Sequence, residues 1–254
     1  MGLLSHRRAG ITFDHCSRSG AAGTHLDLKT VAGSHPEAPS DRNTVQKATV
    51  RNTGDLLELR AAAAECQGCR LYLHGTQTVF GEGQASADLV FVGEQPGDKE
   101  DISGRPFVGP AGAVLDQALA AIRIDRRRCY VTNAVKHFKW RAAGKRRIHQ
   151  KPSAREIEAC RPWLEAEIRV INPRVLICLG ATAVRSILRR DLPILKNRGR
   201  WMSSPLCLKT LVTVHPSSVL RAPDPAQRNK GYEEFVADLA KAAEYLDRRF
   251  PSHL

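Results

Sequence analysis

The chain has 254 residues, of which 42% are hydrophobic, so it is long enough for one α/β domain with an extension. Its net charge of +13 and pI near 9.8 favour a polyanionic partner such as nucleic acid. No apolar run reaches the ~18 residues of a membrane span, and His6, Arg7, Arg8 and Asp14 interrupt the stretch where a secretory signal would lie, so we expect a cytoplasmic protein without membrane contact.

Residues 1–50 are rich in Gly, Ser, Thr, His and charge without a sustained period, which predicts a poorly ordered extension before a domain at 51–254. In that domain, hydrophobic spacing predicts strands at 88–93, 129–133, 174–180 and 208–214. It predicts five helices: one after Thr53-Gly54 that ends near Cys66, one at 110–122, one from Ser153 towards Val170, one that follows the strand at 174–180 and ends near Leu188, and one at 229–248. This alternation predicts a three-layer αβα fold with a central four-stranded parallel sheet.

Polar segments follow three of the predicted strands. Gly93–Asp98, Asn133 and His215 each end or directly follow a strand, and ligands of open α/β sheets bind beyond the carboxyl ends of the strands. We therefore expect these segments to form one pocket. By itself, His215 before Pro216 could simply end a strand and bond to backbone.

Two glycine-rich segments accompany this pocket. The first, Gly93-Glu-Gln-Pro-Gly97, fits neither a Walker loop nor the dinucleotide-binding fingerprint, and alone it could be a strand-ending turn. The second, 104–112, holds one aromatic residue, Phe107. Phe107 could be a core residue, or a ring that stacks on a base flipped out of DNA.

A basic loop is predicted at 144–151. Residues 136–151 contain seven Lys or Arg and no acid, so binding of a polyanion should weaken steeply with salt. We interpret Arg146, Arg147 and Lys151 as phosphate ligands that position the loop without reading sequence. His149 could be another phosphate contact, a solvated residue, or a nucleophile or base near the sugar–phosphate chain.

The seven cysteines favour metal or thiol chemistry over disulfides in a cytosolic chain. Cys129 and Cys178 lie in apolar runs and are expected in the core, and Cys16 and Cys207 receive no role. Three cysteines remain, Cys66, Cys69 and Cys160. The Cys66-Gln-Gly-Cys69 spacing could hold zinc or an iron–sulfur cluster.

Four motifs together resemble the family 4 uracil-DNA glycosylases: Gly93-Glu-Gln-Pro-Gly-Asp-Lys-Glu-Asp101, Gly104-Arg-Pro-Phe-Val-Gly-Pro-Ala-Gly112, Val131-Thr-Asn-Ala-Val-Lys136 and His215-Pro-Ser-Ser218. The resemblance covers about three quarters of the chain, from Cys66 to the last helix. Lys145-Arg-Arg-Ile-His149 with Gln95 is similar to the UdgX subgroup, whose members excise uracil and stay covalently attached to the sugar.

The resemblance implies a role for each site residue. Phe107 would stack on the extruded uracil, Asn133 would read its polar edge, and Gln95 and Asp98 would lie beneath base and sugar. His215, followed by Ser217 in its motif, would donate to the departing uracil. Glu94 would orient His149, which would attack the anomeric carbon.

The family also carries a [4Fe–4S] cluster held by four cysteines, one of them directly after a Val-Lys pair. In this chain that position is His137, and since histidine can ligate iron, the expected ligands are Cys66, Cys69, Cys160 and His137. A structural zinc ion is the alternative.

The sequence thus predicts a monomeric repair enzyme that excises uracil from DNA, preferably single-stranded because extrusion then costs less, and ends as a His149–deoxyribose conjugate. A family 4 glycosylase that turns over is the first alternative. A non-catalytic iron–sulfur protein that binds single-stranded DNA is the second.

Overall fold

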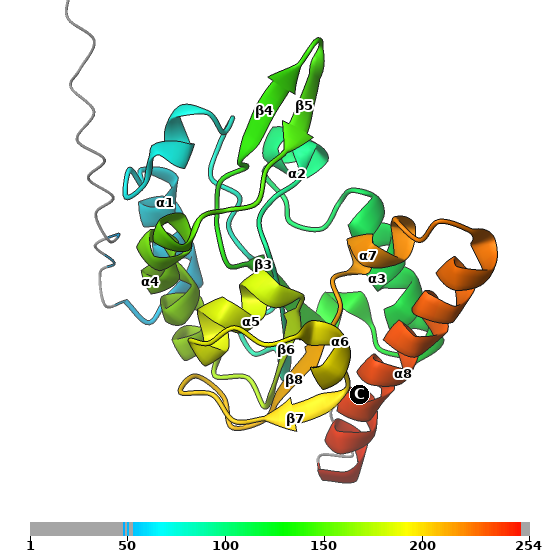
Figure 1. The fold of residues 1–254 in the computed structure, drawn as a ribbon. Coiled ribbons are helices and arrows are strands. Elements are labelled where there is room, and N and C mark those ends of the chain that lie inside the picture. Colours follow the sequence, from blue (N-terminus) through cyan, green and yellow to red (C-terminus); the bar gives the residue numbers. More distant parts are fainter. Residues whose placement is uncertain (1–47, 49, 51–52, 250–254) are drawn as a thin grey trace, which may run out of the picture. The chain divides into compact units, whose positions relative to one another are not determined.

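A six-stranded sheet forms the centre of the domain (Figure 1). The structure is a computed structural model, and it describes residues 48, 50 and 53–249. The predicted extension 1–50 lies outside the described residues except for Ala48 and Val50. In spatial order the strands are β1 (Glu82–Gly83), β3 (Cys129–Asn133), β2 (Leu89–Gly93), β6 (Val175–Leu179), β8 (Thr210–Thr213) and β7 (Arg200–Met202).

The four central strands, β3, β2, β6 and β8, are parallel, which confirms the predicted sheet. Two short edge strands, β1 and β7, add to it in antiparallel orientation and were not predicted. They have only two and three residues, too few to show an alternating pattern.

Helices cover both faces of the sheet, as predicted for three layers (Figure 1). On one face lie α3 (Pro110–Ala121), α7 (Pro216–Leu220) and α8 (Pro225–Arg249), and on the other lie α1 (Leu56–Ala64), α4 (Ala154–Ile171) and α5 (Ala181–Leu188). Short helices complete the described chain: η1 (Arg70–Leu73), α2 (Asp98–Ser103), η2 (Arg126–Arg128) and α6 (Ile194–Asn197). No helix in this part of the chain is long and apolar enough to cross a bilayer.

The central strands are buried on both faces, so successive residues pack into different clusters. Leu89 and Phe91 pack with α3 and α8, whereas Val90 and Val92 pack with α4 and α5. This explains why the strands read as continuous apolar runs. Cys129 and Cys178 are buried core residues, as expected.

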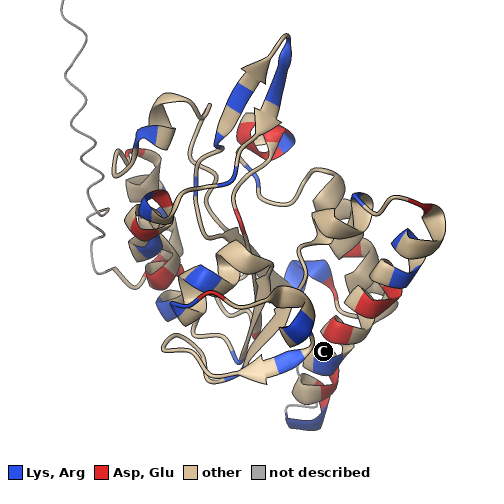
Figure 2. Cartoon of the chain, viewed as in Figure 1, with Lys and Arg blue, Asp and Glu red and all other residues tan. Residues whose placement is uncertain are grey.

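The predicted basic loop is a β-hairpin, so the prediction of a loop was wrong. β4 (Trp140–Ala143) pairs with β5 (Arg146–His149), and Gly144-Lys145 form a two-residue turn. Gly144 has φ +59°, which suits a turn that favours glycine first. Cations lie along both strands (Figure 2). The hairpin escaped prediction because both strands are largely exposed and do not alternate apolar with polar residues.

Candidate functional site

The polar segments that follow β2, β3 and β8 meet around one cavity of about 700 Å³. This volume suits a small ligand such as a nucleobase with its sugar. Eight predicted site residues line it: Glu94, Gln95, Asp98, Phe107, Asn133, His149, His215 and Ser217. Arg146 and Arg147 do not contribute to the described lining.

Phe107 presents its ring to the cavity from an unusual backbone conformation. Its φ is +56°, a left-handed value that a bulky side chain rarely adopts. Such strain often marks a functional position. Its ring lies 6.0 Å from that of His215, with 28° between the ring planes. Gly93 lies beneath, where a Cβ would come within 2.6 Å of the Phe107 ring and 2.4 Å of Asn133 Oδ1.

Glu100 ties the two glycine-rich segments together. Its carboxylate accepts from the Gly97 N–H at 3.1 Å and from the Gly109 N–H at 2.7 Å, and the side chain is buried. The loop that carries Phe107 is thereby fixed to the segment after β2. No sequence pattern predicts this contact, because Glu100 is only one of several acids in α2.

His215 caps the N-terminus of α7 and is neutral at physiological pH. Burial lowers the pKa of its imidazole to about 4. Its Nδ1 accepts from the Ser217 N–H at 3.2 Å and lies 2.8 Å from Ser217 Oγ. Since Nδ1 is an acceptor, the single proton of the neutral ring is on Nε2, which makes His215 an uncharged hydrogen-bond donor.

Glu94 and His149 lie side by side although their elements are distant in sequence. His149 Nε2 is 3.3 Å from Glu94 Oε1, and the His149 side chain is 49% exposed. Glu94 Oε2 accepts a hydrogen bond from the buried hydroxyl of Thr182. Burial raises the pKa of the Glu94 carboxyl, but hydrogen bonds with His149 and Thr182 outweigh burial and lower it overall. Glu94 is therefore ionised beside an accessible imidazole.

Gln95 holds the base of the hairpin. Its Nε2 donates to the carbonyls of Lys139 (3.2 Å) and Gln150 (3.1 Å), and its Oε1 accepts from the Lys139 N–H at 3.2 Å. The Gln95 side-chain amide thus binds the backbone just before β4 and just after β5. Gln95 therefore holds the hairpin in place relative to the segment after β2. Gln95 also lines the cavity.

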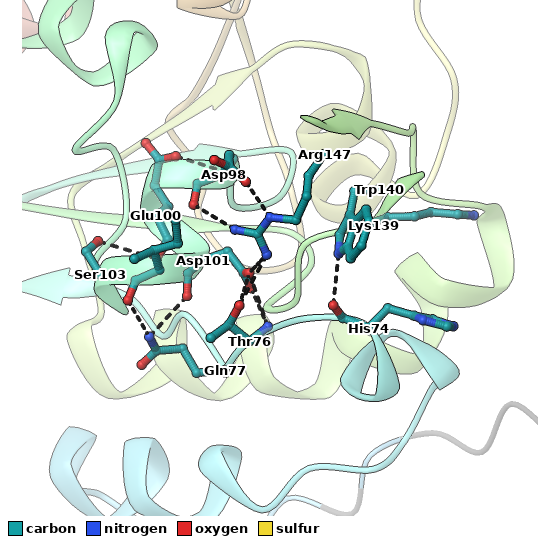
Figure 3. A network of polar contacts seen from close by, with 12 residues as sticks. His74, Thr76, Gln77, Asp98, Glu100, Asp101, Ser103, Lys139, Trp140 and Arg147 are labelled. Carbon is teal, nitrogen blue, oxygen red and sulfur yellow. Dashed lines mark hydrogen bonds and ion pairs between the residues drawn. The ribbon is translucent and has the colours of Figure 1, made fainter. Parts of the chain in front are cut away.

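Arg147 latches the hairpin onto α2 (Figure 3). Its guanidinium donates to Asp98 Oδ1 at 2.5 Å and to the buried Asp101 Oδ2 at 2.6 Å. It also stacks 5.5 Å from the ring centroids of Phe138 and of Trp140. The geometry favours an internal role for Arg147, and its expected role as a phosphate ligand stays a prediction.

Arg146 lies on the other face of the hairpin. In the β4–β5 register Trp140 pairs with His149 and Ala142 with Arg147, so these side chains share one face and Arg146 shares the opposite one with Arg141. Arg146 is exposed and forms no ion pair with any of the described residues 53–249. It is available for phosphate, but not from the side that faces the cavity.

The expected metal ligands Cys66, Cys69, Cys160 and His137 line one small void between α1, α4 and the segment after β3. As the described side chains lie, no three His, Cys, Asp or Glu could hold a metal ion. The surroundings suit sulfur ligands nonetheless: Cys66 Sγ accepts from Trp163 Nε1 (3.1 Å), and Cys160 Sγ accepts from the Lys136 N–H (3.2 Å). Hydrogen bonds to sulfur are typical of iron–sulfur sites.

Hydrogen bonds at Nε2 determine the tautomer of His137. The Thr78 hydroxyl donates to the Ala63 carbonyl at 3.0 Å, so it accepts from His137 Nε2 at 2.9 Å. This leaves Nδ1 as the ring nitrogen with a lone pair. The four residues therefore fit the expected group in chemistry, and the ligand set remains a prediction.

Several residues at the site were not among the predicted site residues. Glu100, Leu220 and Arg221 line the cavity, and Thr182 contacts Glu94. Leu220 is 39% exposed at the end of α7. Leu220 and Arg221 follow the His215–Ser218 motif after one intervening residue, and this position is the sequence signal that could have pointed to these two.

Comparison with known proteins agrees with this geometry. The family model described as the uracil DNA glycosylase superfamily matches residues 80–240. The type-4 uracil-DNA glycosylase of Thermotoga maritima is 36% identical over 188 residues, 72% of this chain and 91% of that protein. Those of Pyrobaculum aerophilum and Archaeoglobus fulgidus are both 34% identical, over 73% and 74% of this chain and 92% and 91% of their own lengths.

Proposed function

The chain belongs to the type-4 uracil-DNA glycosylases of the uracil-DNA glycosylase superfamily, and we propose that it excises uracil from DNA in repair, with His149 capturing the sugar. The observation that carries the excision step is the cavity that unites Phe107, Asn133 and His215 beyond the parallel strands. The contact of His149 with Glu94 supports the capture step.

Base recognition would use Phe107 and Asn133. A target base has to leave the stack to be reached, which costs a few kcal/mol in duplex DNA and less in single strands. The Phe107 ring would recover part of this by stacking, about 1–3 kcal/mol. The Asn133 amide can donate to a uracil carbonyl and accept from the ring N–H, a pattern that cytosine reverses. We therefore expect single-stranded, uracil-containing DNA as the preferred substrate.

Breaking the glycosidic bond sends its electron pair to the base, which leaves as an anion, and makes the sugar cationic. The neutral Nε2–H of His215 would donate to the departing base. The ionised carboxylate of Glu94 would lie near the positive sugar. Both interactions are stronger in the transition state than in the ground state, so they accelerate the reaction.

Capture by His149 would form a bond between an imidazole nitrogen and the anomeric carbon in place of the bond to uracil. The attacking nitrogen supplies the electron pair, and the ring becomes an imidazolium. Glu94, 3.3 Å from His149 Nε2, would stabilise this cation or accept its proton. The enzyme would then be consumed in a single turnover.

The [4Fe–4S] cluster would be held by Cys66, Cys69, Cys160 and His137, and its role would be structural. These ligands come from the segment after α1, from α4 and from the segment after β3. A cluster there would join α1 and α4 to the segment that leads into the hairpin. No chemical step is assigned to it.

A gel experiment tests the proposal and its alternatives. The protein is incubated with a single-stranded oligonucleotide that contains one uracil, and the products are run under denaturing conditions. A protein band shifted by the mass of the DNA supports capture, and free abasic DNA supports a glycosylase that turns over. Unchanged DNA would reject catalysis and leave a DNA-binding protein.

His149→Ser is the matched variant. It should abolish the shifted band but keep uracil release, because the cavity and His215 remain and water can enter in place of the imidazole. A shifted band of unchanged intensity would reject His149 as the nucleophile.

A further inference from the structure

The two oxygens of the Glu94 carboxylate have different partners. Oε1 faces His149 Nε2 at 3.3 Å, and Oε2 accepts from the Thr182 hydroxyl at 2.5 Å. Thr182 is 2% exposed. We propose that Thr182 is a positioning residue, whose hydroxyl fixes the Glu94 carboxylate in the orientation that serves His149 and the sugar. This inference rests on the proposed role of Glu94.

The place of Thr182 in the fold supports this role. Glu94 follows β2, Thr182 follows β6 and His215 follows β8, and these three strands are adjacent in the sheet. The turn from β6 into α5 therefore lies between the two loops that carry Glu94 and His215. It begins at Gly180, which lies against the Cβ of His215. One turn thus contacts both catalytic loops.

The chemistry requires such a contact. A carboxylate on a flexible side chain can rotate away from His149, whereas a hydrogen bond from a buried donor holds one oxygen and presents the other. Thr182 also contributes to the low pKa of Glu94. The other charged or titratable groups around the cavity are Asp98, Lys99, Glu100, His149, His215 and Arg221.

The test is a double-mutant cycle with conservative rescue. Thr182→Val removes the hydroxyl with little change in shape, Thr182→Ser keeps it, and Glu94→Gln removes the charge. Single-turnover uracil release and conjugate formation are measured for each across the pH range, after confirming equal thermal melts. We expect Thr182→Val to slow the Glu94-dependent steps about tenfold, the loss expected for one hydrogen bond to a charged group, and Thr182→Ser to stay close to wild type.

Two further readouts separate positioning from a general structural role. In Thr182→Val the acid limb of the pH profile should move to higher pH, because the carboxylate loses a bond that keeps its pKa low. In the Glu94→Gln background, Thr182→Val should have almost no further effect. A full additional loss there, or a serine variant as slow as the valine variant, would overturn the proposal.

The outcome is independent of whether His149 captures the sugar. If wild type releases uracil without forming a conjugate, the capture proposal fails and the Thr182 cycle is read from the release rates. If wild type forms the conjugate and Thr182→Val does so at the same rate, the Thr182 proposal fails and capture stands.

Discussion

Lys136 and Glu167 form an ion pair that is sealed from solvent, with side chains 1% and 0% exposed. Lys136 Nζ also donates to Thr132 Oγ1 at 2.6 Å and to the carbonyl of Asn133 at 2.9 Å. The pair therefore anchors the backbone of Asn133, whose side-chain amide is proposed to recognise the base. Lys136 also donates its backbone N–H to Cys160 Sγ, which connects the pocket to the expected cluster site.

Removing Lys136 should destabilise the protein strongly. Lys136→Met leaves the Glu167 carboxylate buried without its counter-ion, which costs about 3–5 kcal/mol. Denaturant unfolding measures the change. The control is Arg185→Met, which breaks an exposed ion pair with Asp191 and should cost about 0–1 kcal/mol. Equal effects of the two substitutions would contradict the anchoring role of the buried pair.

His215 should make stability depend on pH between its native and unfolded pKa values. Burial lowers the native pKa to about 4, whereas an unfolded histidine titrates near about 6.5. Between these values the unfolded state binds more protons, so this group makes the protein less stable as pH falls from about 6.5 to 4. In His215→Gln, the pH dependence of the urea midpoint should be shallower in this window. An unchanged slope would show that His215 titrates normally.

His215→Gln should also slow uracil release by about 10²–10³-fold, because the departing uracil loses one preorganised donor to its developing negative charge. Because His215 is already neutral in wild type, lowering the pH from 8 to about 6 should not alter its contribution. Single-turnover kinetics of the wild type and the variant at several pH values would check this. A variant with the wild-type rate would exclude His215 as the donor.

Arg147 and Arg146 are neighbours in sequence with different predicted effects. Arg147→Lys cannot reproduce the two-armed contact with Asp98 and Asp101, so the hairpin should loosen and His149 capture should fall more than uracil release. The quantity to measure is the fraction of excised uracil that ends as conjugate.

Arg146→Ala is the matched control on the opposite face of the same strand. It should lower DNA affinity uniformly and reduce the salt slope by about 1, as expected for one lost phosphate contact, with the captured fraction unchanged. The assignment of the two hairpin faces would be wrong if Arg146→Ala lowered the captured fraction and Arg147→Lys lowered only the DNA affinity.

The expected cluster can be tested with two buried cysteines. Cys160→Ser should remove the visible absorbance of anaerobically purified protein, because the thiolate of Cys160 is an expected ligand. Cys178→Ser substitutes a cysteine that is equally buried in β6 but away from this site, and should keep the absorbance. His137→Cys should retain it as well, since it restores a fourth thiolate. Iron that survives in Cys160→Ser would reject this ligand set.

Local patterns in the sequence predicted most of the fold. The apolar run at 129–133 is β3, and the Ser153–Glu156 capping box begins α4 as expected. These elements depend on burial and on contacts between near neighbours, which periodicity and capping residues report. The parallel order then placed Asn133 and His215 at one edge, since strands of a parallel sheet end on the same side.

The positions of the supporting contacts depend on the tertiary structure. Thr182 contacts Glu94 across 88 residues of sequence, Arg147 contacts Asp101 across 46, and Lys136 contacts Glu167 across 31. No periodic pattern reports such pairs, because each depends on how separate elements dock. The sequence by itself therefore determined the sheet and the motifs at its edge, and only the docked elements decided which side chains hold Glu94, His149 and Asn133 in place.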